Sequence, residues 1–366
     1  MIETRIERIL LQLIAPVVAI VFAALLAAAI LHFTGADAGS VLGEVVAFGT
    51  TPASLVAVLN KATTFYLAGI AGAIGFRMLL FNIGIDGQYR LAVFFAAVVG
   101  ASVSLPPVLH VTLIVVVAMA VGAGWAALAG YIKVTRGVSE VISTIMLNAV
   151  ATGIIAYLLA PGRLAERVAG SNNIRTTPIP SSGWFPGFSV AGKEVFGFTL
   201  VAVALGIAFW ILLNRTRFGF ELRASGLSLR AAAVSGVNSK RMIFVTMVMS
   251  GAMAGLVGIP QLLGSSHQYG LDFPAGFGFT GLAIAILGRN HPLGVAFGAL
   301  LWAWLERSSQ ILDLLGVSRE IVTIMQATIV LSVVVAYEVV RRVNVRRQQK
   351  LVGRSEHEGI EDGAAA

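Results

Sequence analysis

Two glycine-rich stretches have spacings that could hold a phosphate group. Residues 187–193, GFSVAGK, match the spacing of a phosphate-binding loop, and residues 276–281, GFGFTG, match a dinucleotide-binding fingerprint. The first stretch continues with Glu194, where such a loop needs a Ser or Thr hydroxyl for magnesium. The second opens an apolar run and lacks the strand–turn–helix context of a nucleotide site. We therefore expect close packing or a flexible helix start here, and no ATP bound by this chain.

Side chains that could ligate a metal or activate a nucleophile are scattered along the sequence. The five histidines never lie at metal-ligand spacing from one another or from acids. They are His32, His110, His267, His291 and His357. No pairing of a nucleophile with a base stands out either, so we expect neither a metal site nor an enzyme.

Polar residues inside apolar stretches are the stronger functional signal, because each is costly in hydrocarbon unless it is buried against protein or water. The candidates for a solute pathway or gate are Asn82, Asp86, Gln88, Glu140, Asn148, Asn290 and His291. A further set that could meet a polar, ring-bearing solute at an outer mouth is His267, Gln268, Tyr269, Asp272 and Phe273. The alternatives are hydrogen bonds that tie helices together, and an ordinary loop at 265–279.

The elements that must position these residues are membrane helices. The 366 residues are 57% hydrophobic and only 12% charged, which lies outside the usage of soluble proteins. The net charge is +8, and the basic residues lie between apolar runs. This placement indicates that they set membrane topology and contact lipid headgroups, and we expect no nucleic-acid partner. The absence of cysteine excludes disulfides and thiol chemistry.

Apolar runs long enough to cross a bilayer predict an all-α membrane protein with about ten spans. They lie near 10–32, 62–80, 88–104, 109–132, 139–160, 197–213, 242–263, 275–288, 292–311 and 320–340. With both termini placed inside, most Lys and Arg residues fall in inner segments, as the positive-inside rule requires. We predict a transmembrane domain over 1–354 and a disordered acidic tail over 355–366.

The longest basic interruption, 214–241, is predicted to lie in the cytoplasm. Within it, Ser228 is a typical N-cap, 229–235 is an Ala-rich helix, and Gly236 lies just past its end. A short capped helix between two spans would present a rigid knob to a cytoplasmic partner. The alternative is a solvated basic loop that only sets topology.

Two predicted outer segments are long enough to form structure of their own or to contact a partner. Residues 33–60 could include a short interfacial helix, and 161–196 mix Pro, Gly, Ser and aromatic residues in a way that suits contact with an extracytoplasmic partner. The alternative for 161–196 is a connector whose Trp184 and Phe185 rest at the membrane interface.

Many of the 40 glycines stand at small-xxx-small spacing, which allows close helix approach in lipid. Examples are Gly251 with Gly255, Gly294 with Gly298, and Gly72 with Ala68. The interruptions 81–88, FNIGIDGQ, and 287–294, LGRNHPLG, resemble each other and suggest a duplicated helical unit.

Four ordered blocks resemble the permease subunits of ABC importers in the branched-chain amino acid/ribose permease superfamily, and more narrowly the nucleoside or simple-sugar type. The blocks are FNIGIDGQ at 81–88, GVSEVISTIMLN at 137–148, RFGFELRASGLSLRAAAVSGV at 217–237 and GFGFTGLAIAILGRNHPLG at 276–294. This chain departs from the family pattern at Ile85–Asp86, where a small residue and Glu are usual, and at Leu227–Ser228, where Asn is common.

The resemblance implies a multi-pass permease of a bacterial inner membrane. It makes 214–241 the coupling segment, with an ATPase groove faced by Glu221, Arg223, Gly226, Ala231, Ala232 and Gly236. Implied partners are an ATPase subunit that binds ATP and Mg²⁺, a second homologous permease and an extracytoplasmic substrate-binding protein. The implied cargo is a nucleoside, with ribose or another simple sugar as the alternative. An ion-coupled secondary transporter would need acids deep in the spans, where Glu306 is the main candidate.

Overall fold

The computed structural model describes residues 21–33, 35–167, 170, 173–333, 335 and 342. The chain divides into two compact units. One combines Met1–Val46 with Ser309–Ala366, and the other is Ala47–Ser308. The second unit contains nearly all the candidate site residues and is the one described in detail below. The predicted tail 355–366 lies outside the described residues, as do parts of the predicted spans 10–32 and 320–340.

The described part of the first unit is helical. It contains the helices Val21–Phe33 and Glu320–Val333, most of α2 (Ala38–Gly49) and the 3-10 helix η3 (Ser309–Leu315). Helix α2 falls in the predicted outer segment 33–60, where a short helix was expected. Its position relative to a membrane interface stays a prediction.

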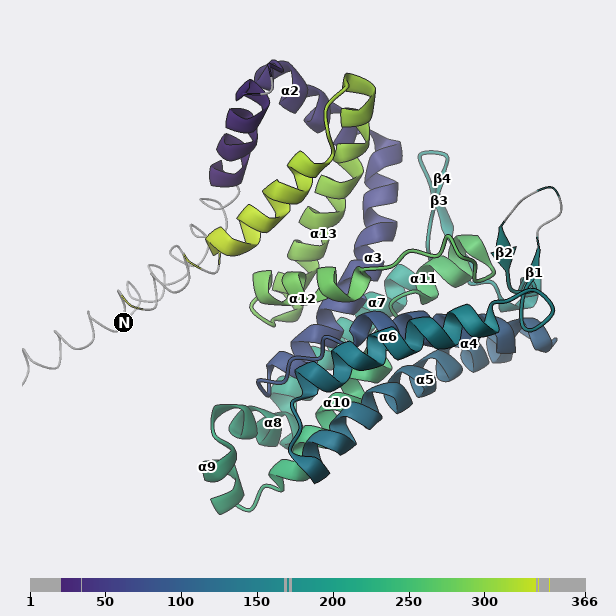
Figure 1. Ribbon diagram of the computed structural model, residues 1–366, viewed down its shortest axis with the longest axis vertical. Helices are drawn as coiled ribbons and strands as arrows, with labels where there is room; N and C mark the ends of the chain where they lie inside the picture. The colour runs from purple at the N-terminus through teal and green to yellow at the C-terminus, as the bar shows by residue number, and fades with distance from the viewer. Residues whose placement is uncertain are drawn as a thin grey trace, which may run out of the picture. The chain divides into compact units, whose positions relative to one another are not determined.

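Four long helices of the second unit pack along one another (Figure 1). They are α4 (Ile85–Ser102), α5 (Pro107–Arg136), α6 (Glu140–Leu158) and α10 (Ser239–Gly255). Glycines allow α5 and α10 to approach each other closely. A Cβ atom on Gly251 would clash with the Gly122 carbonyl, and one on Gly255 would clash with the Ala118 carbonyl. The predicted role of Gly251 and Gly255 in close packing is confirmed.

Helix α3 is the central element of the second unit. It packs against the two helices that the interruption at 287–294 separates. The elements are α3 (Pro52–Phe76), α12 (Phe277–Leu287) and α13 (Pro292–Ser308). The predicted start of this span at residue 62 is wrong. The Thr51 hydroxyl accepts a hydrogen bond from the Ser54 amide, and Pro52 follows as the first helical residue, so the helix begins there.

Within the described residues, five helices are long and apolar enough to cross a membrane. They are Pro52–Phe76, Pro107–Arg136, Glu140–Leu158, Phe198–Arg215 (α7) and Ser239–Ser266. The last agrees with the predicted span 242–263, but its helix is not regular throughout. Helix α10 ends at Gly255, and the chain continues through α11 (Ile259–Gln261) into the π-helix η2 (Leu262–Ser266). Glycines and Pro260 interrupt the regular hydrogen-bond ladder there.

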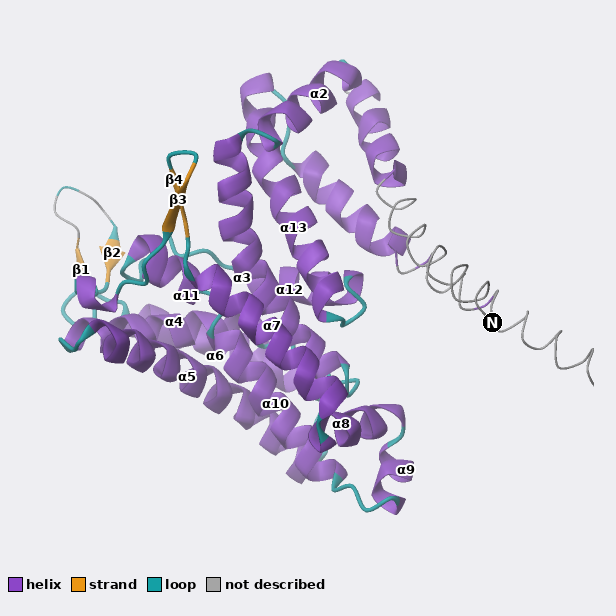
Figure 2. Cartoon of the chain, turned by 180° about the vertical axis from the view of Figure 1, so that it is seen from behind, coloured by secondary structure: helices purple, strands orange, loops and turns teal. Residues whose placement is uncertain are grey.

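The described part of segment 161–196 contains short strands, shown in orange in Figure 2. Its elements are β1 (Glu166–Arg167), β2 (Ile174–Arg175), η1 (Ser181–Gly183), β3 (Phe188–Val190) and β4 (Lys193–Val195). Strands β3 and β4 form a hairpin whose turn residues Ala191 and Gly192 both have positive φ. The phosphate-loop spacing of 187–193 therefore belongs to a β-hairpin, with no helix after the glycines to bind a phosphate.

This segment is bonded to the residues after α11. The amides of Thr176 and Ile179 donate to the carbonyls of Tyr269 and His267, both at 2.8 Å. Arg175 and Asp272 form an ion pair at 2.8 Å. Trp184 stacks on His267 and Phe185 contacts Phe198, and their alternative position at a membrane interface stays a prediction.

Candidate functional site

A helix break between α3 and α4 gathers several of the predicted polar residues. The side-chain amides of Asn82 and Gln88 exchange two hydrogen bonds, each 2.9 Å long, and both residues are 1% exposed. Asn82 also donates to Ser250 on α10, whose hydroxyl donates to the Ala71 carbonyl at 2.7 Å. Because these amides bond each other, the break has a fixed geometry inside the bundle.

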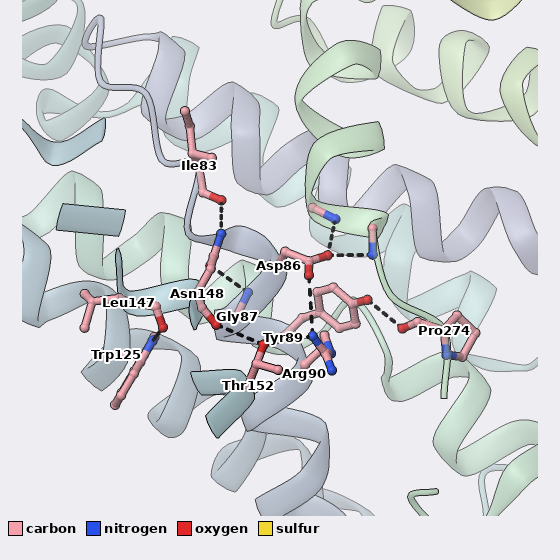
Figure 3. A network of polar contacts seen from close by, with 12 residues as sticks. Ile83, Asp86, Gly87, Tyr89, Arg90, Trp125, Leu147, Asn148, Thr152 and Pro274 are labelled. Carbon is pink, nitrogen blue, oxygen red and sulfur yellow. Dashed lines mark hydrogen bonds and ion pairs between the residues drawn. The ribbon is translucent and has the colours of Figure 1, made fainter. Parts of the chain in front are cut away.

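Asn148 on α6 bonds the backbone on the other side of this break (Figure 3). Its Oδ1 accepts a hydrogen bond from the Gly87 amide, and its Nδ2 donates to the Ile83 carbonyl, both at 2.9 Å. A Cβ atom on Gly87 would lie 2.7 Å from Asn148 Oδ1, so glycine is required for this approach. Three predicted pathway residues, Asn82, Gln88 and Asn148, therefore meet at one break.

Asp86, in the first turn of α4, joins this break to the start of α12. Its Oδ1 accepts hydrogen bonds from the amides of Gly276 at 2.7 Å and Gly278 at 3.4 Å. Its Oδ2 lies 4.0 Å from Arg90, which also donates to Thr152 on α6 (Figure 3). A carboxylate at a helix N-terminus is stabilised by the helix dipole. Sequence reasoning missed Arg90, although its spacing of four residues from Asp86 on one helix was a usable signal.

The second break, between α12 and α13, contacts the end of α3. Arg289 and Asn290 both have positive φ, and the Asn290 carbonyl accepts two hydrogen bonds from the Arg77 guanidinium, from Nη2 at 2.8 Å and Nε at 3.2 Å. His291 Nδ1 accepts a hydrogen bond from the Leu293 amide at 3.3 Å. Burial and the charge of Arg77 both lower the pKa of His291. The second interruption is thus bonded to the end of α3 through Arg77, which the sequence did not single out.

Aromatic rings pack between α4 and residues 269–277. Tyr269 stacks on Phe273 with centroids 5.0 Å apart, and Tyr89 stacks on Phe277 at 5.8 Å. The Tyr89 hydroxyl donates to the Pro274 carbonyl at 2.7 Å. Tyr269 and Phe273 are buried, so in this conformation they do not line an open mouth.

His267 contacts the described part of segment 161–196. Its backbone is left-handed with φ of 51°, and its ring stacks on Trp184 with centroids 3.9 Å apart. Burial lowers the pKa of His267, and nearby Glu194 acts in the opposite direction.

The predicted coupling segment is a pair of capped helices, α8 (Arg217–Leu227) and α9 (Leu229–Val234). The hydroxyl of Ser228 accepts from the Ala231 amide at 3.3 Å, as expected of an N-cap. Gly236 follows the helix with φ of 83°, the left-handed conformation expected of a residue just past a helix end. The predicted capped helix at 229–235 is confirmed to within one residue.

Most of the residues assigned to coupling contact their own chain. Glu221 pairs with Arg217 at 3.1 Å, and Arg223 donates to the Leu213 carbonyl. Gly226 lies so close to the Arg77 carbonyl that a Cβ atom would clash. Ala232 is buried, whereas Ala231 and Gly236 are exposed.

The most exposed apolar side chains of the segment are Leu227 and Val234, at 89% and 91%. Sequence reasoning missed both residues, although each is an apolar side chain within a polar, basic stretch. The contact of Glu221, Arg223, Gly226, Ala231, Ala232 and Gly236 with an ATPase stays a prediction.

Curated relatives resemble this chain over most of its length. The guanosine ABC transporter permease protein NupP of Bacillus subtilis is 30% identical over 338 residues, covering 90% of this chain and 94% of the relative. The nucleoside ABC transporter permease protein NupB of Lactococcus lactis subsp. cremoris is 28% identical, covering 89% and 92%. The glucose ABC transporter permease protein TsgB13 of Haloferax volcanii is 31% identical, covering 77% and 76%.

A protein-family model matches residues 54–336, which include both helix breaks, segment 161–196 and α8–α9. Its description is branched-chain amino acid transport system / permease component. This match agrees with the apolar helices, the buried polar break and the capped helix pair. The chain therefore belongs to the permease component family of branched-chain amino acid transport systems.

Proposed function

We propose that this chain is the membrane permease subunit of an ATP-driven importer, and that a separate ATPase chain binds ATP and Mg²⁺. The observation that carries this is the connection from α8 to the end of α3 and to the second helix break. Gly226 of α8 rests on the Arg77 backbone, and the Arg77 side chain bonds Asn290. Movement of α8 would therefore reach the end of α3 and the second break directly.

Helices α8 and α9 are the proposed contact with the ATPase. Leu227 and Val234 are exposed apolar side chains in an otherwise basic segment, and such residues suit a protein partner. Closure of the ATPase would push α8–α9, and the packed contacts at Gly226 would pass this movement on, because packed interfaces change between discrete arrangements. Alternating access then follows from movement of the two breaks relative to each other.

The proposed topology has about ten spans with both termini in the cytoplasm of a bacterium. The basic composition of 214–241 supports an inner position for α8–α9. The segment 161–196 would then lie outside, where an extracytoplasmic substrate-binding protein would dock. A second, homologous permease subunit would complete the translocation pathway.

The proposed cargo is a nucleoside. The match to this chain covers more than nine-tenths of NupP and of NupB, and these relatives are named for guanosine and nucleosides. The side chains at the first break also suit this cargo, since the rings of Tyr269 and Phe273 could stack on a base and the amides of Asn82, Gln88 and Asn148 could bond ribose hydroxyls. Tyr269, Phe273, Asn82 and Gln88 are buried, and Asn148 is bonded to the backbone of the break, so substrate would enter only when the pathway opens.

A sugar is the second candidate cargo, because the glucose permease TsgB13 is 31% identical to this chain. Hydroxyl-rich sugars would use the same amides and would need the aromatic rings less. The two cargoes are distinguished by competition between a nucleoside and its sugar.

The test is uptake of radiolabelled adenosine, guanosine, uridine, ribose and glucose in cells with and without this gene, in a host that lacks other nucleoside carriers. We expect gene-dependent nucleoside uptake that excess ribose does not compete. Ribose or glucose uptake without nucleoside uptake would retain the permease and overturn the cargo. Uptake that a protonophore abolishes while cellular ATP stays high would contradict ATP-driven transport and favour an ion-coupled carrier.

A further inference from the structure

A groove of about 440 Å³ lies between α3, α7 and α13, away from the polar break. Small residues form part of its lining, including Ala62 on α3 and Ala202 and Gly206 on α7. Gly206 lies directly against the Tyr66 hydroxyl, so glycine allows α7 and α3 to approach there. The nucleoside pathway proposed above does not use this groove.

The side chains that line the groove expose mostly hydrocarbon. The Thr63 hydroxyl lies 2.9 Å from the Thr199 hydroxyl and also donates to the Leu59 carbonyl at 2.9 Å. These hydroxyls are therefore satisfied by the protein, and much of the remaining lining is aliphatic. Such a surface fits an alkyl chain and offers little to a sugar or a nucleoside.

The groove runs along the middle of α7 over about half the thickness of a bilayer core. Its lining on α7 runs from Thr199 to Trp210, which is about 16 Å at the helical rise of ~1.5 Å per residue. The hydrocarbon core of a bilayer is about 30 Å thick. A spanning helix from a partner would need contact over the whole thickness, whereas the length of this groove suits a single acyl chain.

A cationic side chain lies beyond one end of the groove. Arg215, at the end of α7, is exposed, and its guanidinium lies 6.0 Å from the Trp210 ring centroid. Among the described residues, Arg215 forms no ion pair, whereas the neighbouring Arg217 is paired with Glu221. Basic side chains at the cytoplasmic ends of membrane helices attract anionic lipid headgroups.

We propose that this groove is a binding site for an anionic phospholipid of the inner leaflet. One acyl chain enters the groove beside Trp210, and the phosphate contacts Arg215. The site holds α3, α7 and α13 together in the membrane, next to the second break at Asn290. The inference is independent of the cargo.

The test uses the full-length protein in nanodiscs and two lipids with identical acyl chains, phosphatidylglycerol and phosphatidylcholine. Native mass spectrometry measures how many copies of each lipid the protein retains. We expect preference for phosphatidylglycerol, and Arg215→Gln should reduce that preference about fivefold, as expected for one basic residue near a membrane surface. Arg217→Gln is the matched control and should leave the preference unchanged. An equal preference in wild type and in Arg215→Gln would overturn the headgroup assignment.

Occupation of the groove is tested separately with Val203→Trp, because Val203 lines the groove at an exposed position. Leu200→Trp is the control, since Leu200 is exposed on the same helix but outside the lining. Val203→Trp should remove the retained lipid, and Leu200→Trp should not. A phosphatidylglycerol with a photoreactive acyl chain should label peptides from α7 in wild type, and labelling confined to other helices would overturn the proposal.

A protein partner in the groove is the competing occupant. The chain contains no cysteine, so Ile207→Cys places a single thiol at the groove. In native membranes this thiol should not cross-link to another protein with a short bismaleimide. A specific cross-link to a second permease chain would show that protein covers the groove, and it would overturn the lipid site without affecting the proposed transport function.

Discussion

The guanidinium of Arg77 donates two hydrogen bonds to the backbone carbonyl of Asn290, 213 residues further along the chain. Arg77 follows the last residue of α3, and its own carbonyl lies against Gly226 of α8. One residue therefore contacts the proposed coupling segment with its backbone and the second helix break with its side chain. This arrangement directly connects the proposed coupling segment with the second helix break.

Replacing Arg77 with Lys should weaken this connection while keeping the positive charge. Lysine cannot reproduce the two donors of the planar guanidinium. A hydrogen bond to a charged group contributes about 1.5–3 kcal/mol, so uptake should fall by at least about tenfold if the contact transmits movement. The measurement is gene-dependent uptake at equal membrane abundance. Arg217→Lys, on the exposed surface of α8, is the control and should transport normally.

Gly226→Val should separate α8 from the end of α3. Any Cβ atom at Gly226 clashes with the Arg77 carbonyl, which is backbone and cannot rotate away. We expect normal membrane insertion and loss of uptake. Gly153→Val is the matched control, because nothing lies within 4 Å of a Cβ atom at that position on α6. Full uptake by Gly226→Val would show that the close contact has no part in transport.

Gln88→Leu should destabilise the first break. It leaves the buried Asn82 amide without its reciprocal partner, at a cost of about 1–3 kcal/mol in unfolding free energy. The double variant Asn82→Leu with Gln88→Leu should lose less than the sum of the single variants, since neither amide is then left unpaired. Thermal unfolding of the purified protein measures this. Additive losses would contradict the direct pairing.

The stability of the protein should fall as the pH drops below the ordinary His pKa of 6.5. The folded state lowers the pKa of His291, so it favours the neutral ring, whose Nδ1 accepts from Leu293. The unfolded chain binds a proton first, and stability present above pH 6.5 is therefore lost as the pH falls through the lowered pKa. His291→Asn keeps an acceptor without titrating and should flatten the melting-temperature profile between pH 7.5 and 5. An unchanged profile in this variant would place the titrating group elsewhere.

Local features of this structure could be predicted from the sequence because their causes are local. The cap at Ser228 and the helix end at Gly236 each depend on residues within one or two turns, and the spacing of Gly251 and Gly255 on one helix face marks a surface for close packing although it does not name the partner helix. The meeting of Arg77 with Asn290, and of Asp86 with Gly276, depends on tertiary packing that no periodicity reveals. The early start of α3 was missed because polar Asn60 and Lys61 obscured its apolar pattern.

The most direct test of the coupling proposal places a single cysteine at Val234, the exposed apolar end of α9, in this otherwise cysteine-free chain. A photoreactive maleimide on Val234→Cys, in membranes of cells that express the complete transporter, should cross-link to a separate ATP-binding chain. The same label on Val190→Cys, in the exposed hairpin of segment 161–196, should not. Cross-linking of the ATP-binding chain from Val190→Cys but not from Val234→Cys would contradict both the coupling role of α8–α9 and the proposed orientation in the membrane.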